Sequence, residues 1–158
     1  MGDTTERDLA ESIADYRAAT EEFLAVAAAL SPADLDRSAE EPGGWTPRMV
    51  IHHVADSEAN SYVRLRRLLA EPAGTTIQGY DEAHWAEVLH YDRPIEASLA
   101  VFRAVRAASA ELLGTITDAD LDRTGTHTDS GVYSLRDWLE IYAAHAEDHA
   151  AQIRRARE

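Results

Sequence analysis

The chain has 158 residues with 15 basic and 29 acidic side chains, and its formal net charge at pH 7 is −14. A chain this acidic disfavours nucleic acid and anionic membranes as partners. It contains no cysteine, which excludes disulfides, thiolate metal ligands and a thiol nucleophile on the protein itself, and leaves histidine and carboxylate as metal ligands.

Length and hydropathy predict one domain without a membrane segment. A chain of 158 residues has an ordinary single-domain size, so residues 1–158 are expected to fold around one core. The sequence has no apolar run of about 18 residues and no signal-peptide pattern at its amino end. We therefore expect a soluble, cytoplasmic protein with no membrane partner.

The first half of the chain predicts two long helices. Residues 4–30 carry apolar side chains alternately four and three positions apart, which is typical of a helix with one buried stripe, and a helical turn is expected over residues 31–37. A breaker at residues 41–44 is followed by Thr46 and Pro47, which suit a helix cap and a first-turn proline. The second helix is predicted from Pro47 to Ala70.

A long connector over residues 71–94 follows, longer than a compact bundle needs. Within it, residues 81–89 predict a short helix capped by Asp81. Tyr80, His84 and Trp85 are candidates to line the mouth of a cleft, and the alternative is a segment packed for structure alone. Residues 95–116 repeat the pattern of the first helix and predict the third long helix.

Two segments of the sequence resemble each other. Residues 30–38 and 116–124 share most of their positions, and each follows one predicted helix and precedes another. This indicates an internal duplication, in which two similar helical hairpins build one four-helix bundle. Residues 125–131 are expected to form a loop with His127 exposed, and Ser134 is expected to cap the last helix.

The last helix carries His145 and His149, whose spacing of four lets two imidazoles on one helix face share a metal ion. At about 100° per residue, the same face carries side chains that predict burial, namely Leu135, Trp138, Tyr142 and Ile153. The residues expected to point away are Arg136, Glu147 and Ala150. Both histidines should therefore face the interior, either as metal ligands or as core histidines satisfied by hydrogen bonds.

On the second helix, His53 lies on a face that is expected to point inward and yet is unusually polar. His52 lies about 100° away, so the two adjacent histidines cannot both aim at one site. Asp56 shares the face of His53. Candidates to line a cofactor-binding or substrate-binding cleft are Ser57, Asn60, Tyr80 and Trp85. For Ser57 and Asn60 the alternative is a solvated face.

Three stretches together resemble the DinB superfamily, and most closely its YfiT-like branch. They are residues 45–58 (Trp-Thr-Pro-Arg-Met-Val-Ile-His-His-Val-Ala-Asp-Ser-Glu), Tyr80-Asp81 with Trp85 and Tyr91, and His145-Ala-Glu-Asp-His149. The resemblance covers nearly the whole chain. It implies an all-α four-helix bundle in up-down-down-up order, often a homodimer, that binds one divalent metal ion through three histidines.

Carried over position by position, the metal ligands implied by the resemblance are His53, His145 and His149. Both helix faces agree with this assignment. Imidazole suits several divalent metals, and we expect zinc or nickel. Asp56 is a candidate catalytic residue that accepts a hydrogen bond from a ligand imidazole and so fixes its tautomer, and the alternative is an exposed salt bridge.

Three neutral imidazoles on a divalent ion leave one coordination position open. A low-molecular-weight thiol there would make the protein an S-transferase acting on an electrophilic substrate, as in family members that use bacillithiol or mycothiol. Metal-bound water would make it a metal-dependent hydrolase, a description that other members carry. We favour the transferase, because Glu147 lies on the outer face and no general base stands beside the histidines. A third possibility is a non-catalytic metal-binding stress protein.

Overall fold

A computed structural model describes residues 8–37 and 44–157 of the chain. Four long helices make up most of it, namely α1 (Leu9–Ala28), α3 (Pro47–Ala70), α5 (Glu96–Leu113) and α6 (Leu135–Ala156). The short elements are α2 (Pro32–Leu35), β1 (Thr75–Ile77), α4 (Glu82–Val88), the 3-10 helix η1 (Asp118–Asp122), β2 (Thr124–His127) and β3 (Gly131–Ser134).

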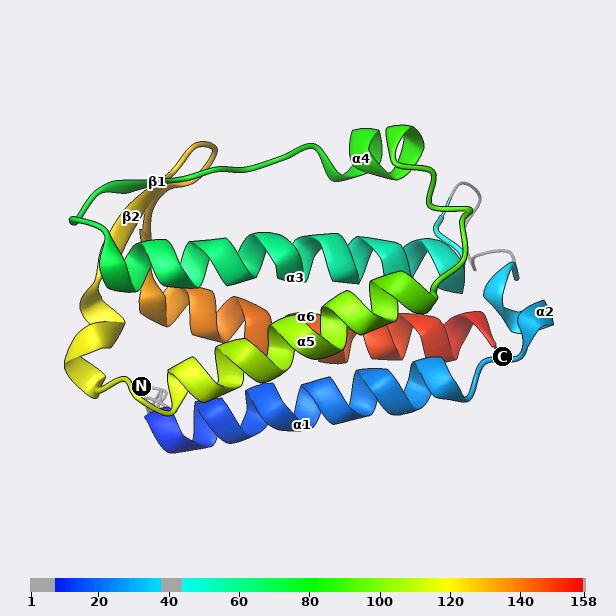
Figure 1. The fold of residues 1–158 in the computed structure, drawn as a ribbon, viewed down its shortest axis with the longest axis horizontal. Coiled ribbons are helices and arrows are strands. Elements are labelled where there is room, and N and C mark those ends of the chain that lie inside the picture. Colours follow the sequence, from blue (N-terminus) through cyan, green and yellow to red (C-terminus); the bar gives the residue numbers. More distant parts are fainter. Residues whose placement is uncertain (1–7, 38–43, 158) are drawn as a thin grey trace, which may run out of the picture.

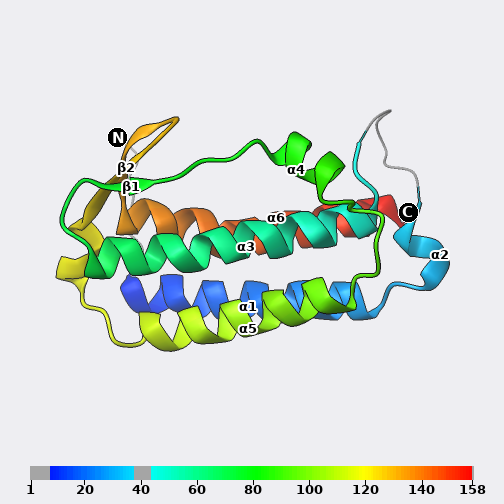
Figure 2. The ribbon, with the colours of Figure 1, turned by 45° about the horizontal axis from the view of Figure 1, so that its top comes forward.

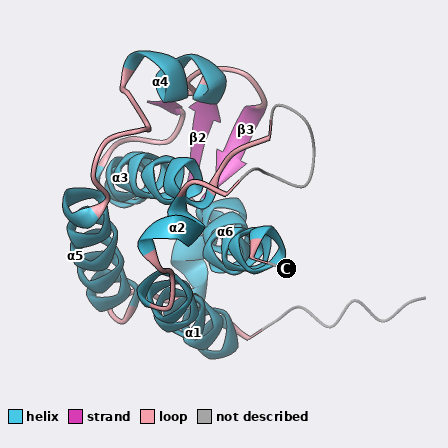
Figure 3. Cartoon of the chain, turned by 90° about the vertical axis from the view of Figure 1, so that its right-hand side faces the viewer, coloured by secondary structure: helices cyan, strands magenta, loops and turns pink. Residues whose placement is uncertain are grey.

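The long helices form the predicted bundle. Around it the order is α1, α6, α3, α5, so that α1 packs beside α6 and α3 beside α5 (Figures 1 and 3). The chain runs one way along α1 and α6 and the opposite way along α3 and α5, which confirms the up-down-down-up order. None of the described helices is both long and apolar enough to cross a bilayer.

Local capping explains where the helices begin. The Thr46 hydroxyl accepts a hydrogen bond from the Met49 amide and Pro47 occupies the first turn, so α3 has the predicted bounds. Asp81 caps α4 in the same way, and Ser134 caps α6. Within the predicted first helix, residues 4–7 lie outside the described part of the chain, as do residues 41–43 of the predicted breaker.

The two similar segments fold alike. Ser31 and Asp34 at α2 exchange side-chain and backbone hydrogen bonds in a capping box, and Thr117 and Asp120 at η1 do the same. Each box follows one long helix of the bundle. Each hairpin therefore has an equivalent turn between its two helices, as the duplication hypothesis requires.

The prediction of a loop at residues 125–131 was wrong, because this segment belongs to a β-hairpin. Strand β2 pairs antiparallel with β3 and parallel with β1, which places the start of the connector beside the segment that leads into α6. Gly125 makes this pairing possible, because a Cβ there would lie 2.7 Å from the Thr75 carbonyl oxygen. From β1 the connector runs along α3 to α4, on the side of the bundle away from α1 (Figures 1 and 2).

The core contains a buried ion pair between its apolar clusters. Arg106 donates from Nη1 to Glu58 Oε1 at 3.0 Å and to the Tyr142 carbonyl oxygen at 2.9 Å, and both charged side chains are 0% exposed. Its Nη2 and Nε donate to the Tyr16 carbonyl and the Thr20 hydroxyl of α1. One guanidinium thus joins α1, α3 and α6 to α5.

The predicted orientation of Ala150 was also wrong. Ala150 is 0% exposed and lies in the apolar cluster with Phe23 of α1. Helix α6 packs against both α1 and α3, so its buried arc is wider than the single stripe inferred from the histidines.

Candidate metal centre

The structure brings His53 of α3 together with His145 and His149 of α6. One ligand-type nitrogen from each ring lies within 4.8 Å of the others. The ring centroid of His53 lies 5.5 Å from that of His145 and 4.9 Å from that of His149. The ring centroids of the two α6 histidines lie 4.5 Å apart. The i, i+4 spacing on one helix and a single inward position on its antiparallel neighbour produce this cluster, which the resemblance implied and with which both predicted helix faces agree.

The interior keeps these imidazoles neutral. Burial, together with the neighbouring His149, lowers the pKa of His53 to about 4 and that of His145 to about 3. Burial also lowers the pKa of His149, against the opposing influence of Gln152 and Glu82. Neutral imidazole is the form that binds a metal ion, so no proton has to be removed near neutral pH.

Hydrogen bonding orients His149. Its Nδ1 lies 2.7 Å from Gln152 Oε1, which can only accept, so Nδ1 carries the proton and Nε2 carries a lone pair. That Nε2 lies 3.2 Å from Nε2 of His145. Two ring nitrogens facing each other this closely, beside a third imidazole, match the donor set of a divalent cation.

Within residues 8–37 and 44–157 the cluster holds three side chains and no fourth histidine or carboxylate. His84 is exposed on α4, and His127 lies in the wall of a neighbouring cavity. Three ligands with a vacant position are typical of catalytic metal sites, whereas structural sites use four.

His52 and Asp56 have roles away from the triad. The two ring nitrogens of His52 lie 2.7 Å from Ser98 Oγ and 2.8 Å from the Arg93 carbonyl oxygen, so it is a satisfied core histidine. The role of Asp56 in orienting a ligand imidazole stays a prediction. Asp56 Oδ2 accepts a hydrogen bond of 2.7 Å from the Tyr91 hydroxyl, because the connector packs Tyr91 over this part of α3.

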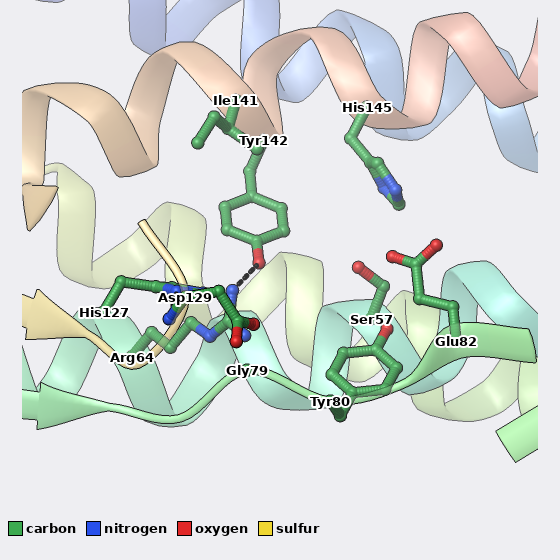
Figure 4. A pocket seen from close by; sticks show the side chains of 10 residues that line it. All are labelled: Ser57, Arg64, Gly79, Tyr80, Glu82, His127, Asp129, Ile141, Tyr142 and His145. Atoms are coloured by element: carbon green, nitrogen blue, oxygen red, sulfur yellow. Dashed lines mark hydrogen bonds between the residues drawn. The ribbon is translucent and has the colours of Figure 1, made fainter. Parts of the chain in front are cut away.

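A cavity of about 260 Å³ opens beside the triad, and His145 forms part of its wall (Figure 4). Two of the four predicted cleft residues, Ser57 and Tyr80, line it. The Asn60 amide instead donates to the Asp56 carbonyl of its own helix, and Trp85 stacks against Tyr80 with centroids 4.3 Å apart.

Three charged residues of this wall were missed in the sequence, namely Arg64, Glu82 and Asp129. Glu82 comes from the first turn of α4, and in Figure 4 its carboxylate points towards His145. The capped start of α4 was predictable, but its position over α3 depends on how the connector folds. The earlier inference that no base stands near the histidines therefore took no account of Glu82.

Fold and site together define a four-helix bundle with a three-histidine cluster that opens into a polar cavity. A family model described as the DinB superfamily matches residues 15–153, so the chain belongs to this superfamily.

Two relatives are each called a "putative metal-dependent hydrolase". The one from Oceanobacillus iheyensis is 42% identical over 111 residues, which are 70% of this chain and 64% of that protein. The one from Bacillus mycoides is 38% identical over 116 residues, covering 73% and 66%. The match thus spans less than two thirds of each relative.

Two solved structures share the fold. YfiT from Bacillus subtilis, described as "a probable metal-dependent hydrolase with an unusual four-helix bundle topology", superposes with a TM-score of 0.86 at 27% identity, covering 99% of this chain and 91% of that one. The four-helix bundle protein TT2238 superposes with a TM-score of 0.65 at 25% identity, covering 93% and 98%.

Proposed function

We propose that this chain is a metal-dependent enzyme in which His53, His145 and His149 hold one divalent cation, zinc or nickel. The observation that carries the proposal is the cluster of three neutral imidazoles with no fourth protein ligand among the described residues. A cation bound there lowers the pKa of a water molecule or thiol at its vacant position. Gln152 holds the ring of His149, and Trp45 covers His53 with ring centroids 4.7 Å apart.

The nucleophile we propose is a low-molecular-weight thiol of the bacillithiol or mycothiol type, transferred to an electrophilic small molecule. The cavity beside His145 supports this choice. It is small and its walls carry hydroxyls and charges of both signs, which suits a polar co-substrate better than an apolar one. The protein has no cysteine, so the sulfur must come from the co-substrate.

Hydrolysis is the second candidate, and Glu82 favours it. A carboxylate at the mouth of the cavity, facing the triad, is placed to accept a proton from an attacking water molecule. The names of the two relatives point the same way. A purely metal-binding stress protein is less well supported, because a closed structural site needs four ligands.

Metal content tests the centre itself. The native protein should hold one equivalent of divalent metal by elemental analysis. His53→Ala, His145→Ala and His149→Ala should each lose it while the helical circular dichroism is retained. His84→Ala, on exposed α4, is the matched control and should keep it. Full metal content in any of the three triad variants would remove that residue from the site.

A thiol-dependence assay then decides the reaction class. The metal-loaded protein is incubated with 1-chloro-2,4-dinitrobenzene and, separately, bacillithiol, mycothiol or glutathione. Conjugation that requires one of the thiols and is lost in His145→Ala supports the transferase. Thiol-independent hydrolysis of 4-nitrophenyl acetate that falls in Glu82→Gln would instead support the hydrolase.

Assembly as a homodimer remains a prediction. Light scattering on the eluting peak from size-exclusion chromatography tests it directly.

A further inference from the structure

Arg64 lies in the wall of the cavity with no acidic partner. Its Nη1 donates to the Tyr142 hydroxyl at 3.1 Å and its Nη2 to the Gln78 carbonyl oxygen at 2.7 Å. Among the described residues, no carboxylate oxygen lies within 4.0 Å of the Arg64 guanidinium, the distance that defines an ion pair. This is unexpected in a chain with 29 acidic residues, where Arg48 and Arg106 both pair with carboxylates.

The guanidinium also has unused hydrogen-bonding capacity. Arg64 Nε is buried and has no hydrogen-bond partner, and only two of the five N–H groups of the side chain have the acceptors named above. An anion that enters the cavity can therefore form an ion pair and charge-assisted hydrogen bonds with this guanidinium.

Neutral donors lie beside the guanidinium. The Tyr142 hydroxyl accepts from Arg64, so its own proton remains to be donated. Ser57 and Tyr80 interact with each other farther along the same cavity wall, on the side of His145. Figure 4 shows Arg64, Tyr142, Ser57 and Tyr80 around the cavity.

The cavity connects this group of donors to the triad. Tyr142 and His145 are one turn apart on α6, with ring centroids 6.0 Å apart, and both line the cavity. A small molecule whose reactive end reaches the histidines can therefore place a group a few bonds away at Arg64.

We propose that this end of the cavity binds a carboxylate group of the small-molecule substrate, through the Arg64 guanidinium and the Tyr142 hydroxyl. This inference rests on the proposed function, in which the reactive end of the same molecule lies at the three histidines. Glu82 and Asp129 also border the cavity, and their charges oppose an anion. Removing the charge of Asp129 should therefore tighten carboxylate binding, whereas removing that of Arg64 should weaken it.

The test uses protein loaded with cobalt(II), in which a bound thiolate gives a charge-transfer band in the near ultraviolet. Two thiols of matched size are titrated, 3-mercaptopropionate and its uncharged amide, 3-mercaptopropanamide. In the unaltered protein the carboxylate thiol should bind roughly tenfold more tightly, the size expected of a hydrogen bond to a charged group. Equal affinities would overturn the proposal.

Three variants test whether Arg64 causes the tighter binding of the carboxylate thiol. Arg64→Gln should bring the two affinities within about twofold of each other, and Asp129→Asn should widen the preference. Arg67→Gln is the matched control, because Arg67 is exposed on the same helix, and it should leave the preference unchanged. A preference that survives Arg64→Gln overturns the proposal. Unchanged melting temperature and cobalt content in Arg64→Gln exclude a merely structural effect.

The failure of the thiol function is distinguishable from the failure of this inference. If neither thiol produces the band, the transferase proposal fails. The carboxylate site is then decided on metal-free protein by saturation-transfer NMR with propionate and propionamide. A propionate signal that is lost in Arg64→Gln and kept in Arg67→Gln supports the site. A signal equal in all three proteins overturns it.

Discussion

Replacing Arg106 with methionine should destabilise the protein strongly and in a pH-dependent way. The change removes a guanidinium that is 0% exposed and leaves the Glu58 carboxylate, also 0% exposed, without its counter-charge. Breaking one half of a buried ion pair costs about 3–5 kcal/mol, against a total of about 5–15 kcal/mol for a domain. At roughly 2–4 °C per kcal/mol for a chain of this size, the melting temperature should fall by about 6–20 °C.

The loss should come mainly from Glu58. The Tyr16 and Tyr142 carbonyls that Arg106 contacts lie within helices, where backbone N–H groups also bond them. Burial raises the pKa of Glu58, and Arg106 normally opposes that rise. Without Arg106 the folded state holds the Glu58 proton more tightly than the unfolded state does. Stability is therefore kept below the ordinary glutamate pKa and lost as the pH rises through the folded-state value.

Urea unfolding, followed by circular dichroism at about pH 5 and about pH 8, gives the free energy of unfolding of the variant and the parent. The effect is the difference between these two free energies at each pH. The difference should be larger at the higher pH. The double variant Arg106→Met/Glu58→Leu should recover most of the loss, because no unpaired charge remains. A loss below about 1 kcal/mol, or equal losses at both pH values, would refute the reasoning.

Three further outcomes are expected. Gln152→Leu should weaken metal binding roughly 10–100-fold in a chelator competition, because His149 loses the acceptor that fixes its tautomer, while Asn60→Ala should not. The metal-free protein should lose stability as the pH falls below about 6.5, by up to about 1.4 kcal/mol per pH unit for each of His53 and His145, because the unfolded imidazoles take up protons that the folded ones do not. A melting temperature that stays constant down to about pH 5 would contradict this. Gly125→Ala should cost about 1–3 kcal/mol in urea unfolding, because its Cβ would lie 2.7 Å from the Thr75 carbonyl oxygen.

The helices and the triad were predictable because their signals are local. Thr46 and Pro47 fix the start of α3 through neighbouring atoms, and the bounds of this helix agree with the prediction. The spacing of His145 and His149 fixes their common face. His53 was implied as the third ligand by the resemblance to the DinB superfamily, and the polar inward face of α3 agreed with it. The structure brings the three together, and metal binding by them remains a prediction.

The missed features depend on contacts between distant segments. Strands β1, β2 and β3 have three or four residues each, too few for an alternating apolar pattern, and β1 pairs with a strand far along the chain. The ion pair of Arg106 with Glu58 joins two helices, and a single sequence does not distinguish it from exposed charges. The contact of Gln152 with His149, three residues apart on one helix, was accessible from spacing alone and was overlooked.

Gly79 shapes the wall of the cavity by having no side chain. A Cβ on this residue would lie 2.2 Å from Asp129 Oδ2 and 3.0 Å from His127 Cε1, so a larger residue would displace these two side chains of the β-hairpin, both of which line the cavity. The Thr128 hydroxyl accepts a hydrogen bond from the Gly79 amide at the same contact. A homologue with a larger residue here would carry the side chains equivalent to Asp129 and His127 in other positions, and so would present a differently lined entrance above an unaltered histidine cluster. Substrate range within the superfamily can thus diverge through one position outside the reactive centre.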